Sequence, residues 1–212
     1  MKRWFVVEYR LFFAGLTIAA MSVQFAHNNG LAGFDPVNFF SFFTIESNIF
    51  IGLVFIFTSL LLICKKRENS TVSLLRGAAA LYMTVTGIVY VLLLSGLEDS
   101  LSTPIPWVNA VLHYIMPLVA LLDWLLIKPP RAIAFKKTIW WLTFPLAYFA
   151  YSLIRGHSTG WYPYPFLNAQ EHGYAHVVAI SLGLAVAMLS LVWFFAWSTK
   201  PEKQTSHVLN KS

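Results

Sequence analysis

The chain has 212 residues, of which 58% are hydrophobic and 11% are charged. A soluble domain is about one quarter charged and less than half apolar, so this composition excludes the soluble-enzyme, disordered and fibrous classes. A net charge of +6 at pH 7 would suit nucleic acid only if the basic residues clustered beside stacking aromatics, whereas here they lie between apolar runs. We therefore expect an integral membrane protein that binds no nucleic acid.

Six apolar stretches are long enough to cross a bilayer as helices of about 20 residues. In chain order they cover residues 5–26, 39–63, 75–96, 107–127, 138–154 and 173–198. Glu8 and Arg10 interrupt the first stretch, so we expect a retained helix rather than a cleaved signal peptide. The predicted fold is all-α: a polytopic membrane protein with a six-helix transmembrane domain over residues 1–199 and a polar tail over residues 200–212.

The basic residues predict the orientation of the spans. Of the 15 Lys and Arg residues, all but Arg155 lie at the start of the first span, in the second or fourth loop, or in the tail. Because Lys and Arg concentrate on the cytoplasmic side of membrane proteins, both termini and the polar tail are expected in the cytoplasm. This interpretation counts Arg10 and Arg76 among the charges at the membrane surface.

Polar side chains inside the predicted spans indicate a layer in the outer half of the membrane. With both termini inside, the second, fourth and sixth spans run inward. Thr44 then lies about 7.5 Å, His113 about 9 Å and His176 about 4.5 Å below the start of its span. Asn48 shares a helix face with Thr44, and Asn109 shares one with His113. We expect Thr44, His113 and His176 in one layer.

A threonine hydroxyl that faces an imidazole has the minimum equipment for nucleophilic acyl transfer. The imidazole takes the hydroxyl proton, and a third group fixes the tautomer of the imidazole. Asn48 or Asn109 is expected to supply that third group, or an amide that stabilises an oxyanion. The alternatives are a hydrogen bond from Thr44 to its own backbone and a hydrogen bond from His113 to another helix.

A second function stays open because other ionisable residues lie in the spans, where each needs a partner or a function. Glu46 lies about 200° around the helix from Thr44 and therefore needs a different neighbour. Asp123 is expected to pair with Lys128 or Arg131, or to form a hydrogen bond across helices. The alternative function is a small transporter or sensor whose proton or ion path uses Glu46, His113, Asp123 and His176.

A third reading is a metal-assisted hydrolase. His172 and His176 have the spacing that presents two imidazoles on one helix face to a metal ion. His113 and Glu46 would complete the ligand set, whereas His172 alone would be a hydrated residue at the start of the helix.

Three short motifs, in the same order along the chain, resemble the androgen-induced and androgen-dependent membrane protein family, and more closely its bacterial six-helix relatives. The loop motif lies in a segment rich in aromatic residues and prolines, which suits either an interfacial anchor or a lid over a lipid-facing cavity. The motifs are Phe43-Thr44-Ile45, Trp107-x-Asn109-x-x-x-His113, and His157-x-Thr159-Gly160 followed by Tyr164-Pro165-Phe166-Leu167.

Animal members of that family are threonine hydrolases that cleave fatty acid esters of hydroxy fatty acids. The resemblance implies Thr44 as the nucleophile and His113 as the base, with no cofactor or metal, a lipid or fatty-acid ester as substrate, and the bacterial inner membrane as the location. The chain departs from the family pattern at Glu46-Ser47-Asn48 and at Pro163, which leaves the substrate open.

We therefore expect an intramembrane lipid ester hydrolase that cleaves fatty-acyl esters near the outer leaflet. Thr44 attacks the ester carbonyl, His113 transfers the proton, and water resolves the acyl-enzyme. His157 belongs to the loop motif and is expected to contact the substrate or a lid. The predicted supporting residues are Asn48, Asn109, Glu46, His157 and His176.

Overall fold

The computed structural model describes residues 3–97 and 103–199, and the chain is helical across these ranges, with no strand. The predicted all-α class is therefore confirmed. The predicted polar tail, residues 200–212, lies outside the described residues.

Five helices are long and apolar enough to cross a membrane. They correspond to five of the six predicted spans. They are α1 (Arg3–Asn29), α3 (Phe43–Ile63), α4 (Ser70–Val89) continued by the π-helical η1 (Tyr90–Leu94), the run of α5 (Pro106–Ala110), η2 (Val111–Ile115) and α6 (Met116–Leu126), and α10 (Tyr174–Ser198).

The remaining predicted span, 138–154, falls on a helical run that changes type. The short elements are α2 (Pro36–Phe40), α7 (Phe135–Thr138), the 3-10 turn η3 (Ile139–Leu142), α8 (Thr143–Thr159), the 3-10 turn η4 (Pro165–Leu167) and α9 (Ala169–His172). Pro145 has no N–H to give to the carbonyl of Trp141, four residues earlier. The Tyr82 hydroxyl donates to that carbonyl instead, at 2.8 Å. The interruption leaves α8 with 17 residues, shorter than the five spans.

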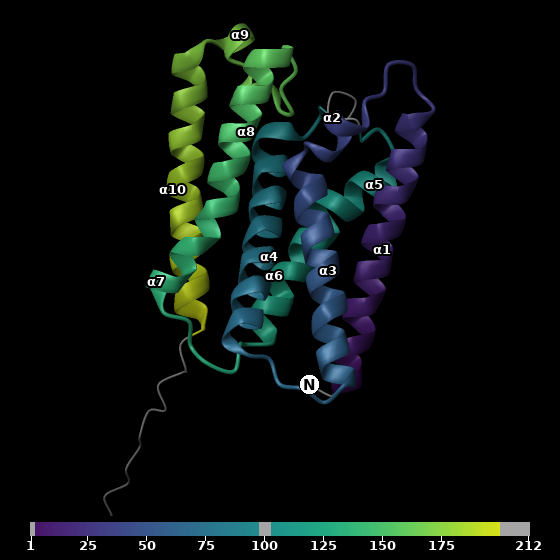
Figure 1. The fold of residues 1–212 in the computed structure, drawn as a ribbon, viewed down its shortest axis with the longest axis vertical. Helices are drawn as coiled ribbons and strands as arrows, with labels where there is room; N and C mark the ends of the chain where they lie inside the picture. Colours follow the sequence, from purple (N-terminus) through teal and green to yellow (C-terminus); the bar gives the residue numbers. More distant parts are fainter. Residues whose placement is uncertain (1–2, 98–102, 200–212) are drawn as a thin grey trace, which may run out of the picture.

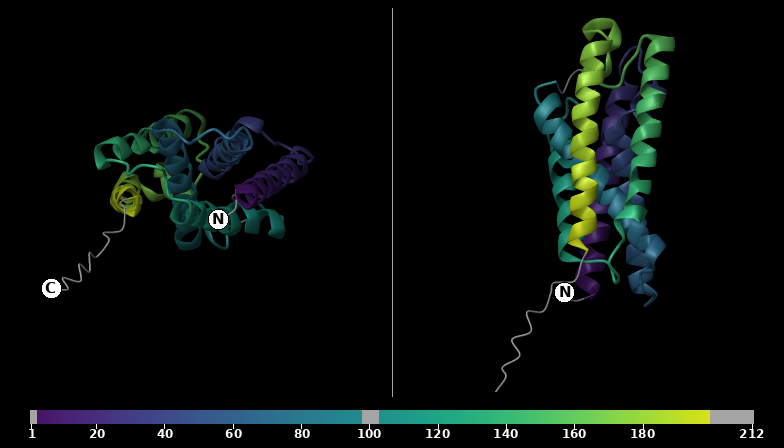
Figure 2. Two further views of the ribbon diagram at one scale, coloured as in Figure 1. Left: turned by 90° about the horizontal axis from the view of Figure 1, so that it is seen from below. Right: turned by 90° about the vertical axis from the view of Figure 1, so that its left-hand side faces the viewer.

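The long helices run side by side along the long axis of the molecule (Figure 1). Helix α1 packs against α3, α3 against α4, and α4 against α6. Helices α1 and α10 lie at opposite edges, as the end-on view also shows (Figure 2). The core therefore sits between α3, α4 and α6.

Apolar side chains cover the outside of this bundle, while many polar side chains are buried within it. Helix α10 is apolar along its length and exposes most of its side chains, including Leu182, Val186 and Trp193. A soluble protein has the opposite distribution. The structure is thus compatible with an integral membrane protein.

Close contact between α4 and the run from η2 to α6 depends on glycine. A Cβ atom added at Gly87 would lie 2.8 Å from Cβ of Pro117, and one added at Gly77 would lie 2.4 Å from the ring of Trp141. Any residue larger than glycine at either position would force the neighbouring side chain or helix to move. Gly87 lets the end of α4 lie close to Pro117 and to the His113 carbonyl, next to η2, whereas Gly77 makes room for the rings of Trp141 and Trp124.

Candidate functional site

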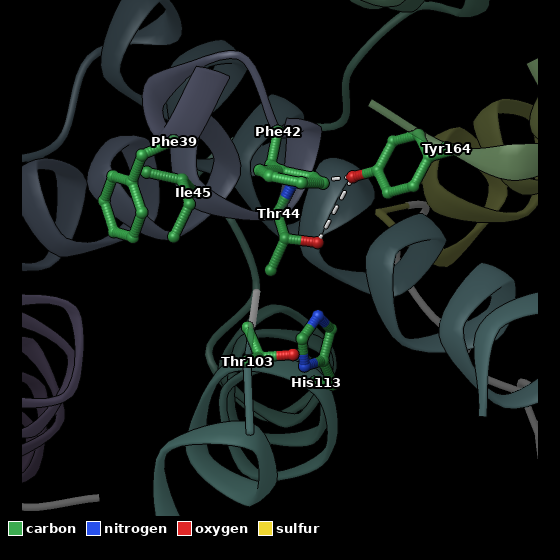
Figure 3. A pocket seen from close by; sticks show the side chains of 7 residues that line it. All are labelled: Phe39, Phe42, Thr44, Ile45, Thr103, His113 and Tyr164. Carbon is green, nitrogen blue, oxygen red and sulfur yellow. Dashed lines mark hydrogen bonds between the residues drawn. The ribbon is translucent and has the colours of Figure 1, made fainter. Parts of the chain in front are cut away.

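Thr44 and His113 line the same small cavity near one end of the bundle (Figure 3). Thr44 lies in the first turn of α3 and His113 in the middle of η2. Phe39, Phe42, Ile45, Thr103 and Tyr164 complete the lining. The cavity has a volume of about 10 Å³, which is room for about one water molecule. The predicted nucleophile and base therefore line one cavity.

Two tyrosines from later in the chain cap the N-terminus of α3. The N-cap residue Phe42 has no side-chain group that caps the helix. Instead, Phe43 N–H donates to Tyr148 Oη at 3.2 Å, and Thr44 N–H donates to Tyr164 Oη at 3.3 Å. These tyrosines satisfy amide groups that the helix itself leaves free.

The Thr44 hydroxyl takes part in the same contact, since its Oγ1 lies 3.4 Å from Tyr164 Oη. In Figure 3 this oxygen points toward Tyr164, and the methyl group points toward His113. A hydrogen bond from Thr44 to His113 therefore requires rotation about χ1 of Thr44. The hydroxyl also lies at the positive end of the dipole of a 21-residue helix, which favours negative charge on Oγ1.

Burial fixes the protonation state of Tyr164. The side chain is buried, and burial raises the pKa of its hydroxyl above the ordinary value of 10.0. Tyr164 therefore keeps its proton at neutral pH and remains a hydrogen-bond donor.

The His113 ring is oriented by its own helix and by Tyr90. Its Nδ1 lies 3.3 Å from the carbonyl oxygen of Asn109. Because a carbonyl only accepts, Nδ1 carries the hydrogen, so in the neutral imidazole Nε2 holds the lone pair that a general base needs. The Tyr90 ring stacks on the imidazole with centroids 4.0 Å apart, and the Asn109 side-chain amide donates to Tyr90 Oη at 2.6 Å.

The π-helical turn around His113 has a sequence cause. Pro117 has no N–H for the carbonyl of His113, four residues earlier, and its ring would crowd that carbonyl in a regular α-helix. Widening the backbone to a π-helical turn relieves this conflict, and such turns are frequent at functional sites. Pro117 is thus a local signal for an irregular backbone at His113.

Asn48 joins the two halves of the site. Its Nδ2 donates to the carbonyl of Thr44 at 2.9 Å and to the carbonyl of Leu112 at 3.2 Å. The side-chain amide of Asn109 is occupied by Tyr90. Both amides therefore hold other groups in position, and the group that fixes the His113 tautomer is the backbone carbonyl of Asn109 rather than an asparagine side chain.

The other predicted supporting residues do not line the cavity. Glu46 is half-buried on α3, and its Oε2 has no hydrogen-bond partner among residues 3–97 and 103–199. His157 is exposed in the last turn of α8, and His176 is exposed in the first turn of α10, with its ring 5.1 Å from that of His172. His176 is separated from Thr44 and His113 because α10 lies at the edge of the bundle and this side of it faces outward.

The ligand set expected for a metal-assisted hydrolase is not assembled. Across the described part of the chain, no three His, Cys, Asp or Glu side chains lie close enough together to hold a metal ion. His172 and His176 are paired on the surface, whereas His113 is buried.

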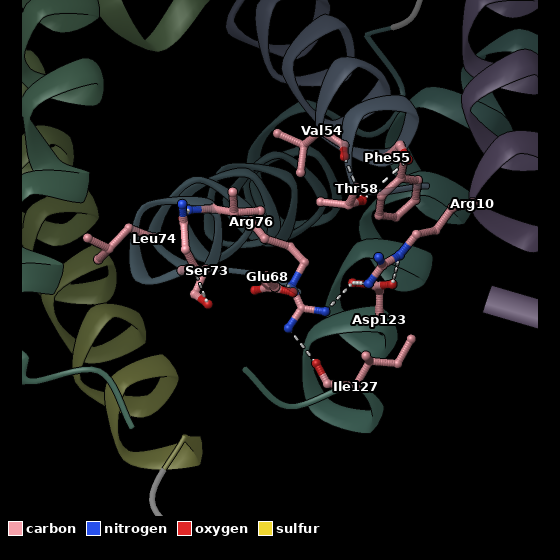
Figure 4. A network of polar contacts seen from close by, with 12 residues as sticks. Arg10, Val54, Phe55, Thr58, Glu68, Ser73, Leu74, Arg76, Asp123 and Ile127 are labelled. Atoms are coloured by element: carbon pink, nitrogen blue, oxygen red, sulfur yellow. Dashed lines mark hydrogen bonds and ion pairs between the residues drawn. The ribbon is translucent and has the colours of Figure 1, made fainter. Parts of the chain in front are cut away.

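Asp123 lies in a buried ionic network on another part of the bundle (Figure 4). Its carboxylate accepts from Arg10 Nε at 2.7 Å and Nη2 at 3.1 Å, and Arg76 Nη1 lies 3.5 Å away. The hydroxyl of Tyr9 also donates to it. The expected ion pair with Lys128 or Arg131 is therefore wrong, because α1 and α4 supply the cations, whereas the alternative of a hydrogen bond across helices is confirmed.

This network corrects the assignment of two basic residues. Arg10 and Arg76 are buried within α1 and α4 rather than at the surface. A buried guanidinium needs a close counter-charge, which Asp123 gives to both and Glu68 gives to Arg76 at 3.5 Å. Removing these two residues from the charge count leaves the asymmetry of the loops intact.

The site includes side chains to which the sequence analysis gave no role. These are Tyr90, Thr103 and Tyr148, while Tyr164 was recognised only as part of a loop motif. Tyr90 is the first residue of η1. Tyr148 lies in α8 and Tyr164 directly precedes η4, so both are far from α3 along the sequence. The sequence did carry a weak signal of the tyrosine caps, because a phenylalanine at position 42 cannot cap α3 and another side chain has to accept from the first amides of the helix.

No family model matches the chain, and no curated protein or solved structure matches it either. The fold and the site therefore carry the interpretation alone. They define an all-helical protein, compatible with a membrane location, that buries a threonine and a histidine in one cavity.

We expect Tyr164→Phe to lower the free energy of unfolding by about 1–3 kcal/mol at neutral pH, because a buried amide loses its partner. The matched variant Tyr174→Phe alters a tyrosine that is 70% exposed and should change stability by less than about 0.5 kcal/mol. Because the folded pKa of Tyr164 is raised, its contribution is complete below pH 10 and is lost at higher pH. Equilibrium unfolding in mixed micelles measures both effects. Equal stability of the two variants would contradict the capping role.

We expect Asp123→Asn to destabilise the protein by about 3–5 kcal/mol, since the buried guanidinium of Arg10 loses its counter-charge and that of Arg76 keeps only Glu68. Glu171→Gln removes an exposed carboxylate and should cost less than about 0.5 kcal/mol. The same unfolding measurement checks both. A small effect of Asp123→Asn would show that water or lipid reaches the network.

Proposed function

We propose that this protein is a membrane-embedded lipid ester hydrolase with Thr44 as nucleophile and His113 as general base. The observation that carries the proposal is the cavity that both side chains line. Two further features support it. The Nδ1–H tautomer of His113 leaves Nε2 able to accept a proton, and the N-terminus of α3 favours negative charge on Thr44 Oγ1.

The reaction begins with rotation of the Thr44 side chain toward His113. Oγ1 attacks the ester carbonyl carbon while Nε2 takes the hydroxyl proton, which gives a tetrahedral oxyanion. The oxyanion collapses, the bond to the alcohol oxygen breaks, and His113 gives its proton to the leaving alcohol. Water then attacks the acyl-threonine while His113 takes its proton; the bond from the acyl carbon to Oγ1 breaks, His113 returns the proton to Thr44 Oγ1, and the fatty acid leaves.

The oxyanion donors in this proposal are Thr44 N–H and the Tyr164 hydroxyl. Thr44 N–H is directed at Tyr164 Oη at 3.3 Å, and Thr44 Oγ1 lies 3.4 Å from the same tyrosine oxygen. A carbonyl oxygen inserted between the N–H and the tyrosine hydroxyl would accept from both. This assignment replaces Asn48 and Asn109, whose amides hold Thr44, Leu112 and Tyr90.

A lipid ester requires the cavity to open, since about 10 Å³ admits little more than water. The cover is aromatic: the Phe42 ring packs against Trp161 at 5.6 Å and against Tyr164 at 5.8 Å. We propose that the segment between α8 and α9 moves outward to admit substrate. The apolar walls formed by Phe39, Phe42 and Ile45 suit an acyl chain rather than a polar ester.

The proposal includes the membrane topology. We assign the run from α7 to α8, Phe135–Thr159, as the remaining span, the fifth of six in chain order, with both termini in the cytoplasm according to the loop charges. Thr44 and His113 then lie in the outer half of the membrane. The location in a bacterial inner membrane and the relationship to the androgen-induced family are parts of the same proposal.

The test is covalent labelling by a fluorophosphonate probe, followed by hydrolysis of a fatty-acyl ester, with the protein in membranes. Thr44→Ala should abolish labelling and lower hydrolysis by about 10³-fold or more, because no nucleophile remains. His113→Ala should lower both by about 10²–10⁴-fold.

The control is Thr84→Ala, which removes another buried threonine whose hydroxyl donates to the carbonyl of Ala80 at 2.8 Å. It should label like the unchanged protein. Undiminished labelling of Thr44→Ala would reject Thr44 as the nucleophile.

A further inference from the structure

A second cavity, with a volume of about 560 Å³, opens at the end of the bundle opposite to Thr44. It lies between the start of α1, the end of α3 and the end of α6. Leu62, which lines it, is about 27 Å from Thr44 along the axis of α3. The two cavities are therefore separate sites.

Three cations at this cavity have no internal counter-charge. The lining includes Arg3, Lys66 and Lys128 together with Arg10 and Glu68. Asp123 neutralises Arg10, and Glu68 lies 3.5 Å from Arg76. Across residues 3–97 and 103–199, Arg3, Lys66 and Lys128 form no ion pair. The cavity thus carries an uncompensated positive charge.

The rest of the lining is largely apolar. Val6 from α1, Leu61 from α3 and Leu126 from α6 contribute hydrocarbon surface. The cations come from the helix ends and the connections next to them, whereas Val6 lies one turn further into α1 than Arg3. The cavity therefore combines a basic entrance with an apolar wall.

We propose that this cavity binds the phosphate group of an anionic membrane lipid, with an acyl chain against the apolar wall. Arg3 can contact phosphate oxygens in a bidentate manner, and Lys66 and Lys128 act as point charges. A basic pocket between helices at a membrane surface is suited to such headgroups. The lipid is favoured over free phosphate because free phosphate gains nothing from Val6, Leu61 and Leu126.

The site is independent of the proposed hydrolase. Binding would add an external anion beside Arg10, which belongs both to the cavity lining and to the Asp123 network. An occupied cavity should therefore hold α1, α3 and α6 together at this end of the bundle.

The experiment is native mass spectrometry of the full chain in detergent, titrated with dioleoyl phosphatidylglycerol, dioleoyl phosphatidylcholine or inorganic phosphate. The test variant carries Arg3→Gln, Lys66→Gln and Lys128→Gln. The control variant carries Arg67→Gln, Lys136→Gln and Lys137→Gln, which removes the same charges from exposed positions that do not line the cavity.

We expect phosphatidylglycerol to bind the unchanged protein and the control equally, and the test variant about a hundredfold more weakly. Phosphatidylcholine should show no such difference. If inorganic phosphate binds with the same dependence and displaces phosphatidylglycerol at equal concentration, the phosphate site is supported and its ligand is free phosphate. Equal phosphatidylglycerol affinity of the test and control variants would overturn the proposal.

A variant that fails to fold would confuse these outcomes, so circular dichroism of each protein without lipid comes first. If the test variant is unfolded, Lys66→Gln with Lys128→Gln replaces it, since both lysines are exposed and neither forms an ion pair with Asp123. This double variant should still bind phosphatidylglycerol more than about tenfold more weakly. An unchanged affinity would again overturn the proposal.

Discussion

The placement of Thr44 depends on how the N-terminus of α3 is capped. The first backbone N–H groups of a helix have no carbonyl partner within the helix, and the side chain of the N-cap residue Phe42 offers no acceptor. Tyr148 and Tyr164 supply the missing acceptors, 105 and 120 residues further along the chain. Tyr164 also lines the cavity, so the cap on Thr44 N–H and part of the wall of the site depend on one hydroxyl group.

The position of His113 rests on a backbone irregularity that proline causes and glycine permits. Pro117 prevents a regular α-helical turn at His113, and Gly87 lets the neighbouring helix approach Pro117 closely. The π-helical turns η1 and η2 then face each other, which stacks Tyr90 on the imidazole. A ring held on one face and at Nδ1 loses little further entropy when it acts as a base.

Much of this could be predicted from the sequence, and the failures have a common physical cause. Apolar length predicted six spans, five of which are long apolar helices in the structure. Depth along each helix predicted a common layer for Thr44 and His113, and the two side chains line one cavity. Both predictions depend on one helix at a time. The partners of Asp123 could not be predicted, since Arg10 and Arg76 approach it from helices far apart in the chain. The caps of α3 were missed for the same reason, and His176 is exposed rather than in the cavity because depth does not specify which way a helix faces.

Opening of the site exchanges hydrogen bonds rather than only breaking them. If Tyr164 moves away alone, Thr44 N–H is left without an acceptor at a cost of about 1–3 kcal/mol. The carbonyl oxygen of an ester that enters between Thr44 N–H and the Tyr164 hydroxyl would accept a hydrogen bond from each of these groups. Developing negative charge on that oxygen strengthens both hydrogen bonds. The hydrogen bond between Thr44 N–H and Tyr164 therefore favours the closed state of the empty cavity, and the open state is stabilised most when the ester carbonyl is bound.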